Sequence, residues 1–175
     1  MLGWVGRVCT DISAHGHDIT VYNLGIRGQT SGEIAGRWQA EAAPRLSQQS
    51  YERRGLVFSF GANDAAQDIP LETSKANTEA ILGQAKSVAP ILLVGPAPIA
   101  DTPASDTRIT ALCEVMADCA IRYGIAYLPI FHALRQNQTW ISEAMVNDGA
   151  HPGAGGYSAL ADLIRSWRAW QDWFR

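Results

Sequence analysis

An aspartate and a histidine lie three positions apart near the C-terminus, in the sequence N-D-G-A-H-P (residues 147–152). An imidazole can act as a general base, and a neighbouring carboxylate can hold it in the required tautomer and stabilise its protonated form. Asp148 and His151 can therefore supply two of the three groups of a Ser-His-Asp catalytic triad. The residues that follow are small, and they open an apolar segment that is typical of a helix.

Two other polar segments directly follow apolar runs, Y-N-L-G-I-R-G-Q-T-S (22–31) and F-S-F-G-A-N-D-A (58–65). Gly28 can bring a backbone N–H close to a substrate, because it has no side chain to block the approach. Asn63 can add a side-chain amide donor. Two such donors can form the oxyanion hole that ester hydrolysis requires. Arg27, which precedes Gly28, can contact an acyl or leaving group.

Each of these segments also has a simpler interpretation. The glycine turn resembles a dinucleotide-binding loop, and G-A-N-D can be a turn whose polar side chains bond to the backbone. The D-x-x-H pair can be a surface hydrogen bond or half of a metal site. However, the glycines lack the G-x-G-x-x-G spacing, and the sequence offers no third metal ligand at a suitable spacing. The three segments together favour an esterase-type site that uses no metal and no cofactor.

Apolar runs and amphipathic segments alternate along the chain and predict the elements that must position these residues. Helices are expected over 4–15, 32–46, 72–88, 105–123 and 154–174, and strands over 18–25, 55–61, 91–98 and 125–130. Strands that are apolar throughout indicate a parallel sheet covered by helices on both faces. Ligands of such sheets bind beyond the carboxyl ends of the strands, where the three polar segments fall. With no linker or repeat, residues 1–175 are expected to form a single α/β domain.

The composition and charge of the chain argue against two classes of partner, nucleic acids and the interior of a membrane. A net charge of −3 and a pI near 5.7 argue against nucleic-acid binding. No apolar stretch approaches the ~20 residues that span a bilayer. The N-terminus does not have the pattern of a signal peptide, and the three cysteines have no metal spacing, so a cytoplasmic protein with reduced thiols is expected.

Aromatic residues at 167, 170, 173 and 174 are expected to pack on the sheet, and part of this stripe can serve a homodimer contact.

The three polar segments are similar to sequence blocks of the SGNH, or GDSL-type, esterase and lipase superfamily, which is named for Ser, Gly, Asn and His. The resemblance implies that Gly28 and Asn63 are oxyanion donors and that Asp148 and His151 are the triad carboxylate and base. It also implies a flavodoxin-like three-layer α/β/α fold and a small acyl-ester substrate. The similarity runs through essentially the whole chain, from the opening G-W-V-G-R-V onward.

One block of that family has no counterpart here. Its first strand ends in G-D-S and carries the nucleophilic serine, and no G-D-S occurs in this sequence. The resemblance places Met1 after that serine, so the expected fold lacks its first strand. In the order 2-1-3-4-5 this strand is central, and its loss leaves two facing edges unpaired. None of the serines present is expected on a tight strand-to-helix turn.

Two interpretations of this departure remain. In the first, the native protein carries the serine strand upstream of Met1, and the chain as printed is inactive. In the second, the protein is a non-catalytic pseudoenzyme or a ligand-binding domain on the same scaffold. The first is favoured, because a pseudoenzyme has no reason to keep Gly28, Asn63, Asp148 and His151 together while losing a central strand.

Overall fold

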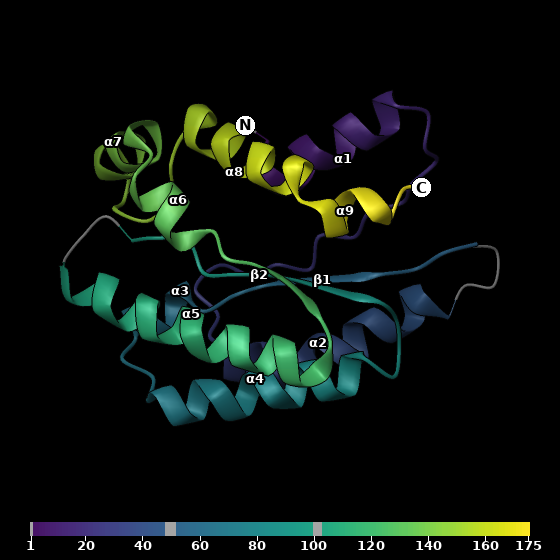
Figure 1. Ribbon diagram of the computed structural model, residues 1–175, viewed down its shortest axis with the longest axis horizontal. Helices are drawn as coiled ribbons and strands as arrows, with labels where there is room; N and C mark the ends of the chain where they lie inside the picture. Colours follow the sequence, from purple (N-terminus) through teal and green to yellow (C-terminus); the bar gives the residue numbers. More distant parts are fainter. Residues whose placement is uncertain (1, 48–51, 100–102) are drawn as a thin grey trace.

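The computed structural model describes residues 2–47, 52–99 and 103–175, and their fold is a three-layer α/β/α arrangement (Figure 1). Three parallel strands form its sheet in the order β1 (Leu56–Ser59), β2 (Ile91–Val94) and β3 (Ala126–Leu128). Val57 of β1 is in register with Leu92 of β2, which is in turn in register with Ala126 of β3. The predicted α/β class and parallel sheet are confirmed.

Helices cover both faces of the sheet (Figure 1). One face packs against α2 (Ser31–Leu46), α4 (Leu71–Ala85) and α5 (Pro103–Tyr123), and the other lies beneath α1 (Trp4–Ala14), α6 (Phe131–Arg135), α7 (Gln138–Val146), α8 (Ala154–Ser166) and α9 (Arg168–Asp172). A short helix, α3 (Ala62–Ala66), follows β1 directly.

An apolar core fills each of the two interfaces between the sheet and the helices. The first contains Trp38, Phe58, Ile81, Leu93 and Met116 among its buried members. The second contains Val8, Leu92, Val94, Trp140, Leu160 and Ile164. Burying a side chain of this size contributes roughly 1.5–3 kcal/mol, so these two cores supply the main driving force for the layered fold.

The start of α2 is set by a capping box formed by Thr30 and Glu33. The Thr30 hydroxyl accepts from the Glu33 backbone N–H at 3.5 Å, and the Glu33 carboxylate accepts from the Thr30 backbone N–H at 2.8 Å. These bonds satisfy N–H groups that the first turn of a helix leaves without a partner. The cap therefore fixes where the preceding glycine turn ends.

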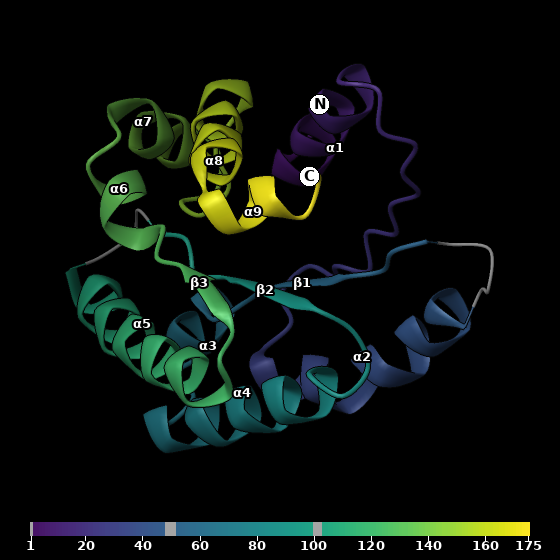
Figure 2. The same ribbon diagram turned by 45° about the vertical axis from the view of Figure 1, so that its right-hand side comes forward.

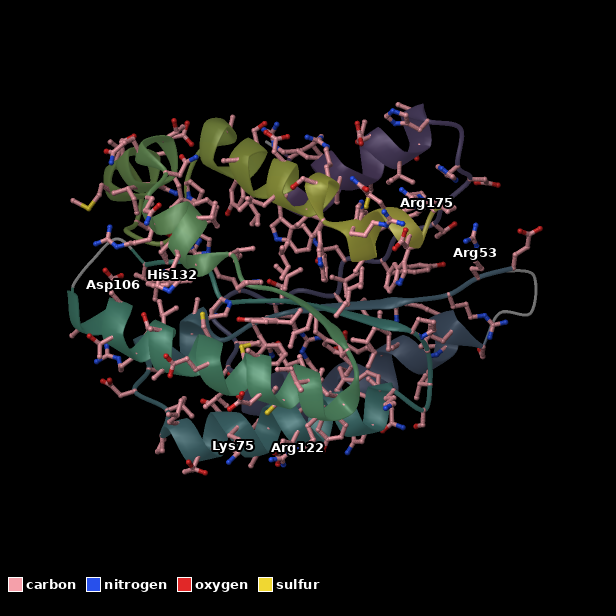
Figure 3. All side chains as sticks on the ribbon, in the orientation of Figure 1. Arg53, Lys75, Asp106, Arg122, His132 and Arg175 are labelled. Atoms are coloured by element: carbon pink, nitrogen blue, oxygen red, sulfur yellow. The ribbon has the colours of Figure 1, made fainter. Side chains whose placement is uncertain are left out.

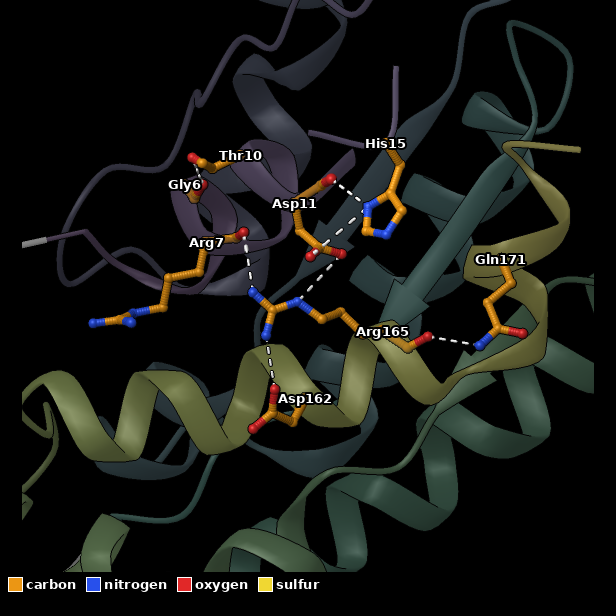
Figure 4. Close-up of polar contacts among 8 residues, drawn as sticks. All are labelled: Gly6, Arg7, Thr10, Asp11, His15, Asp162, Arg165 and Gln171. Atoms are coloured by element: carbon orange, nitrogen blue, oxygen red, sulfur yellow. Dashed lines mark hydrogen bonds and ion pairs between the residues drawn. The ribbon is translucent and has the colours of Figure 1, made fainter. Parts of the chain in front are cut away.

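Arg165 of α8 ties the first helix to the C-terminal half of the chain (Figure 4). Its guanidinium bonds to the Asp162 carboxylate at 2.7 Å and to the Arg7 backbone oxygen at 3.2 Å, and its Nε lies 3.5 Å from the Asp11 carboxylate. Two of these contacts reach α1, so α1 is held on α8 by polar contacts in addition to the apolar core.

The predicted strand over 18–25 is wrong. These residues carry no strand assignment, and Val21 and Tyr22 are 46% and 48% exposed. Figure 2 shows the segment as an irregular trace that runs from α1 to the sheet and on to α2. A strand requires a hydrogen-bonded neighbour, and no strand of the described part of the chain pairs with this segment.

β1 is also less buried than its apolar sequence predicted. Val57 is 38% exposed, whereas its register partner Leu92 is 2% exposed. β2 has a strand on each side and is buried throughout, but β1 is an edge strand within the described residues. The free edge of β1 and the irregular 18–25 segment agree with the sheet expected when the family's first strand is left out.

The remaining differences concern the ends of elements. The helix predicted over 154–174 is broken at Trp167, whose extended backbone (ψ 120°) separates α8 from α9. Its aromatic stripe nevertheless packs on the second core, with Trp170 buried. The sequence did not predict α3, α6 or α7, because helices of five to nine residues hold too few turns for a clear apolar period.

Candidate active site

Asp148 and His151 form the pair that their spacing predicted. Nδ1 of the His151 ring lies 2.9 Å from Oδ2 of Asp148. The other carboxylate oxygen, Oδ1, accepts from the backbone N–H of His151 at 2.8 Å and of Ala150 at 3.1 Å. These backbone donors, followed by the His151 side chain, hold the pKa of the Asp148 carboxyl well below its usual range. An ionised carboxylate therefore orients the ring, and Nε2 is left to meet another group.

The loop that carries this pair is anchored at both ends. It leaves α7 through Gly149, whose φ of 82° requires a glycine, and the Asn147 side chain donates to the His151 backbone oxygen at 2.9 Å. Beyond the histidine, the Glu143 carboxylate accepts from the N–H groups of Gly155 and Gly156 at 3.1 and 2.7 Å. These contacts cap α8 and join it to α7 on either side of the loop.

The glycine turn places Gly28 in a left-handed conformation, with a φ of 82°. No heavy atom lies within 4 Å of the position that a Cβ on Gly28 would occupy, so the space beside this residue is open. The Gln67 side chain donates to the Gly28 backbone oxygen at 2.8 Å, and Arg37 donates to the Leu24 backbone oxygen at 2.8 Å. The turn is thus fixed from α2 and from the end of α3.

Asn63 lies in the first turn of α3, immediately beyond the end of β1. Its Nδ2 donates to the Gln29 backbone oxygen at 2.9 Å, one residue after Gly28. Because an amide group carries two donor hydrogens, one N–H of Asn63 is used by the turn and the other remains for a ligand. The two predicted oxyanion donors therefore belong to adjoining parts of one structure.

Asp64 connects the segment after β1 to the starts of α2 and α4. It is 1% exposed, and its carboxyl group accepts from the Ser31 backbone N–H at 2.8 Å, from the Ser31 hydroxyl and from the Ser74 hydroxyl at 2.8 Å. Asn77 donates to the same Ser31 hydroxyl at 3.0 Å. Ser31 is thereby engaged as a first-turn residue of α2.

Arg27 connects the glycine turn to the D-x-x-H loop. Its Nη2 lies 2.7 Å from Oδ2 of Asp148, the oxygen that also meets the His151 ring. A continuous path of bonded residues therefore joins all four predicted site residues, from His151 through Asp148 and Arg27 to Gly28 and on to Asn63. The sequence did not predict this ion pair, because its partners are 121 positions apart and no local pattern relates them.

Two other arginines, Arg108 and Arg135, are paired with carboxylates. Figure 3 shows His132 and Asp106 close to where β3 leads into α6. Asp106 accepts from Arg135 at 2.7 Å, and Arg108 lies 3.0 Å from Asp68. The His132 ring contacts the Phe131 ring edge-on, with centroids 5.0 Å apart.

Across residues 2–47, 52–99 and 103–175, no group of three or more His, Cys, Asp or Glu side chains is placed to hold a metal ion. No helix in those ranges is both long and apolar enough to cross a membrane. The three cysteines are free thiols, of which Cys119 is buried.

Comparisons with known proteins agree with this fold and show the family. The sequence profile of the GDSL-like Lipase/Acylhydrolase family matches residues 2–159. Among solved structures, an acetylxylan esterase from Geobacillus stearothermophilus has a TM-score of 0.75 at 19% identity, with 93% of this chain and 79% of that chain covered. A lipase/acylhydrolase from Enterococcus faecalis has a TM-score of 0.73 at 26% identity, with 92% and 82% covered. No curated protein sequence matches the chain.

Proposed function

The chain belongs to the GDSL-like lipase/acylhydrolase family, and on that premise we propose that the native protein cleaves small acyl esters through a serine acyl-enzyme. The serine is supplied by a strand that precedes Met1 and pairs with β1. The observation that carries this proposal is the Asp148–His151 pair, at 2.9 Å, beside a turn that offers Gly28 and Asn63 as donors.

Each group has a defined role in this reaction. Nε2 of His151 takes the proton of the serine as its oxygen attacks the ester carbonyl, and then returns that proton to the departing alcohol. Asp148 stabilises the imidazolium formed between these two transfers. The backbone N–H of Gly28 and the second amide hydrogen of Asn63 bind the oxyanion while its charge develops, and one such donor typically contributes ~10²–10³ in rate. Water activated by His151 then releases the acyl group.

The sheet supports a place for the missing strand. β1 has an open edge within the described residues, Val57 is exposed there, and the irregular 18–25 segment pairs with no strand of the described residues. A strand inserted beside β1 would give both of them a partner. Its carboxyl end would emerge at the end of the sheet where Asn63 and Gly61 follow β1, which is where the nucleophile is needed.

The acetylxylan esterase supports the same assignment of roles. Structures of that protein described as catalytic mutants replace a serine, an aspartate and a histidine. Its aspartate and histidine are three positions apart, like Asp148 and His151. Its serine lies near the start of its chain, well before the other two residues.

The proposal is tested on protein purified from its native source. The intact mass is compared with the 19.0 kDa of this chain, and the protein is treated with a fluorophosphonate, which labels activated serines. We expect a larger mass, a label on a serine within an upstream G-D-S, and hydrolysis of p-nitrophenyl acetate. His151→Ala should lose both the labelling and the hydrolysis, and the 175-residue chain alone should be inactive.

A native mass equal to that of this chain would overturn the acyl-enzyme, since no nucleophile would then stand before Asp148 and His151. The protein would in that case be a ligand-binding domain on the same scaffold. Labelling that survives His151→Ala would equally contradict the role given to the histidine.

A further inference from the structure

The exposed side chain of Arg27 is held in one place by a single ion pair. It is 76% exposed, and its contact with Asp148 is the bond that the structure describes for its guanidinium. A long side chain loses rotamer freedom when it is fixed in this way, and an exposed ion pair repays little of that loss in stability. The contact therefore calls for an explanation other than stability.

The two oxygens of the Asp148 carboxylate have different kinds of partner. Backbone groups bond to one oxygen, and the side chains of His151 and Arg27 meet the other. Oδ1 receives two backbone N–H groups, which fix the carboxylate without help from any side chain. Oδ2 is shared between the His151 ring at 2.9 Å and the Arg27 guanidinium at 2.7 Å. Removing Arg27 would thus leave the carboxylate in position but would free Oδ2 to interact with the ring alone.

We propose that Arg27 is a positioning residue that acts on His151 through Asp148, and that its charge weakens the hold of the Asp148 carboxylate on the protonated ring. This inference deepens the proposed function and rests on the role given there to His151. A cation on the shared oxygen offsets part of the attraction that Asp148 exerts on an imidazolium.

The other ionisable groups near the pair, among the described residues, do not duplicate this effect. Tyr157 of α8 has a raised pKa, caused first by burial and then by the charge of Asp148, so it stays neutral at the pH of interest. The Glu143 carboxylate of α7 is engaged by the N–H groups of Gly155 and Gly156. Arg27 is the cation that directly contacts the pair.

The test follows the His151 ring signals by NMR through a pH titration of the full-length native protein, with His151→Asn used to assign them. In Arg27→Gln we expect the His151 titration to move to higher pH by roughly 0.5–1 unit, the size expected of one charge a few ångströms away at a largely exposed site. Arg27→Lys keeps the charge and should titrate near the parent. Arg168→Gln, which removes an exposed arginine of α9, is the matched control and should not move the titration.

Enzyme kinetics supply a second readout. The acid limb of the kcat/KM profile should move to higher pH in Arg27→Gln by the same amount, while the plateau rate stays within about threefold of the parent, because the backbone bonds to Asp148 remain. A role in structure alone would lower the plateau at every pH and leave the limb in place. That result, or an Arg27→Gln titration that coincides with the parent, would overturn the proposal.

The NMR readout does not depend on turnover. A shifted titration in a protein that hydrolyses no ester would support the role of Arg27 and refute the proposed function. An active enzyme in which Arg27→Gln leaves the His151 titration unchanged would support the proposed function and refute the role of Arg27.

Discussion

At the scale of single residues, Gly28 combines two properties that can be separated by experiment. Its positive φ makes any other residue strained, and no heavy atom lies within 4 Å of the place that a Cβ would take, which suits the oxyanion role proposed for its N–H. Gly16 has the same two geometric properties, a φ of 91° and no atom within 4 Å of the place that a Cβ would take, but it lies at the end of α1, away from the site.

Gly28→Ala and Gly16→Ala should therefore cost a similar free energy of unfolding, about 1–2 kcal/mol, because both force an alanine into the left-handed region. Under the proposed function, only Gly28→Ala should also lower kcat/KM of the full-length protein, by ~10²-fold or more, since it would disturb a proposed oxyanion donor. Urea unfolding and ester hydrolysis measure the two effects. Equal activity losses in the two variants would remove Gly28 from the site.

Asp148 makes the stability of the protein depend on pH in a direction that can be worked out. Its pKa is lower in the folded chain than in the unfolded chain, where an aspartate titrates near ~4. The carboxylate therefore stabilises the fold above that pH, and this contribution is lost as the pH falls through the folded value. Asp148→Asn lacks it at every pH.

We expect Asp148→Asn to unfold at a lower urea concentration than the parent between pH 5 and 8, with the gap narrowing steadily below about pH 4. Asp162→Asn, at a carboxylate whose side chain is 67% exposed, serves as the control and should show a much smaller gap. A gap for Asp148→Asn as wide at pH 3 as at pH 7 would show that the bonds to Asp148 do not favour its ionised form.

At the scale of elements, Asp64 shows how three helices are brought to one point. It belongs to α3, yet it accepts from Ser31 at the start of α2 and from Ser74 in α4. Asp64→Ala would leave these buried donors without a partner and should cost roughly 2–4 kcal/mol of unfolding free energy. Asp162→Ala on the surface should change it by less than about 0.5 kcal/mol. Equal effects in the two variants would mean that water or neighbouring groups replace the Asp64 contacts.

Sequence patterns predicted the long elements well, because each one buries a continuous apolar face or begins with a recognisable cap. The helix predicted over 32–46 begins at Ser31 and ends at Leu46 in the structure, after a cap at Thr30. The failures have local causes. The break at Trp167 leaves the aromatic period intact, so the pattern continues across two helices. The α7 helix begins at an Asn137 cap, whose side chain accepts from Trp140 at 2.9 Å, and this was the one sequence signal available for it.

At the scale of the whole molecule, the sequence predicts those parts of the candidate site that lie just beyond the ends of strands. Turns, spacing and the family resemblance predict Gly28, Asn63, Asp148 and His151, and contacts join their segments in the structure. The contacts that join those segments were not predictable, because the Arg27–Asp148 pair and the Asn63–Gln29 bond connect residues far apart in sequence. Whether 18–25 forms a strand depends on a neighbour, and its own apolar residues carry no information about that neighbour.

Amide hydrogen exchange along β1 can show, residue by residue, whether a neighbouring strand is present at its open edge. In a parallel strand, alternate N–H groups point to opposite neighbours, and that of Leu56 donates toward β2, to the Pro90 oxygen at 2.9 Å. The N–H groups of Val57 and Ser59 therefore point to the open edge. In the 175-residue chain we expect their amide hydrogens to exchange with solvent rapidly, while that of Phe58, which faces β2, is protected.

If a serine-bearing strand occupies this edge in the native protein, hydrogen exchange at Val57 and Ser59 should slow by orders of magnitude there, and Phe58 should remain protected in both forms. The same change should extend to alternate amides of 18–25, which would become a strand once its neighbour is present. Val57 and Ser59 amides that are already protected in the 175-residue chain would mean that the edge is closed without an added strand, and the nucleophile would then have to reach His151 by another route.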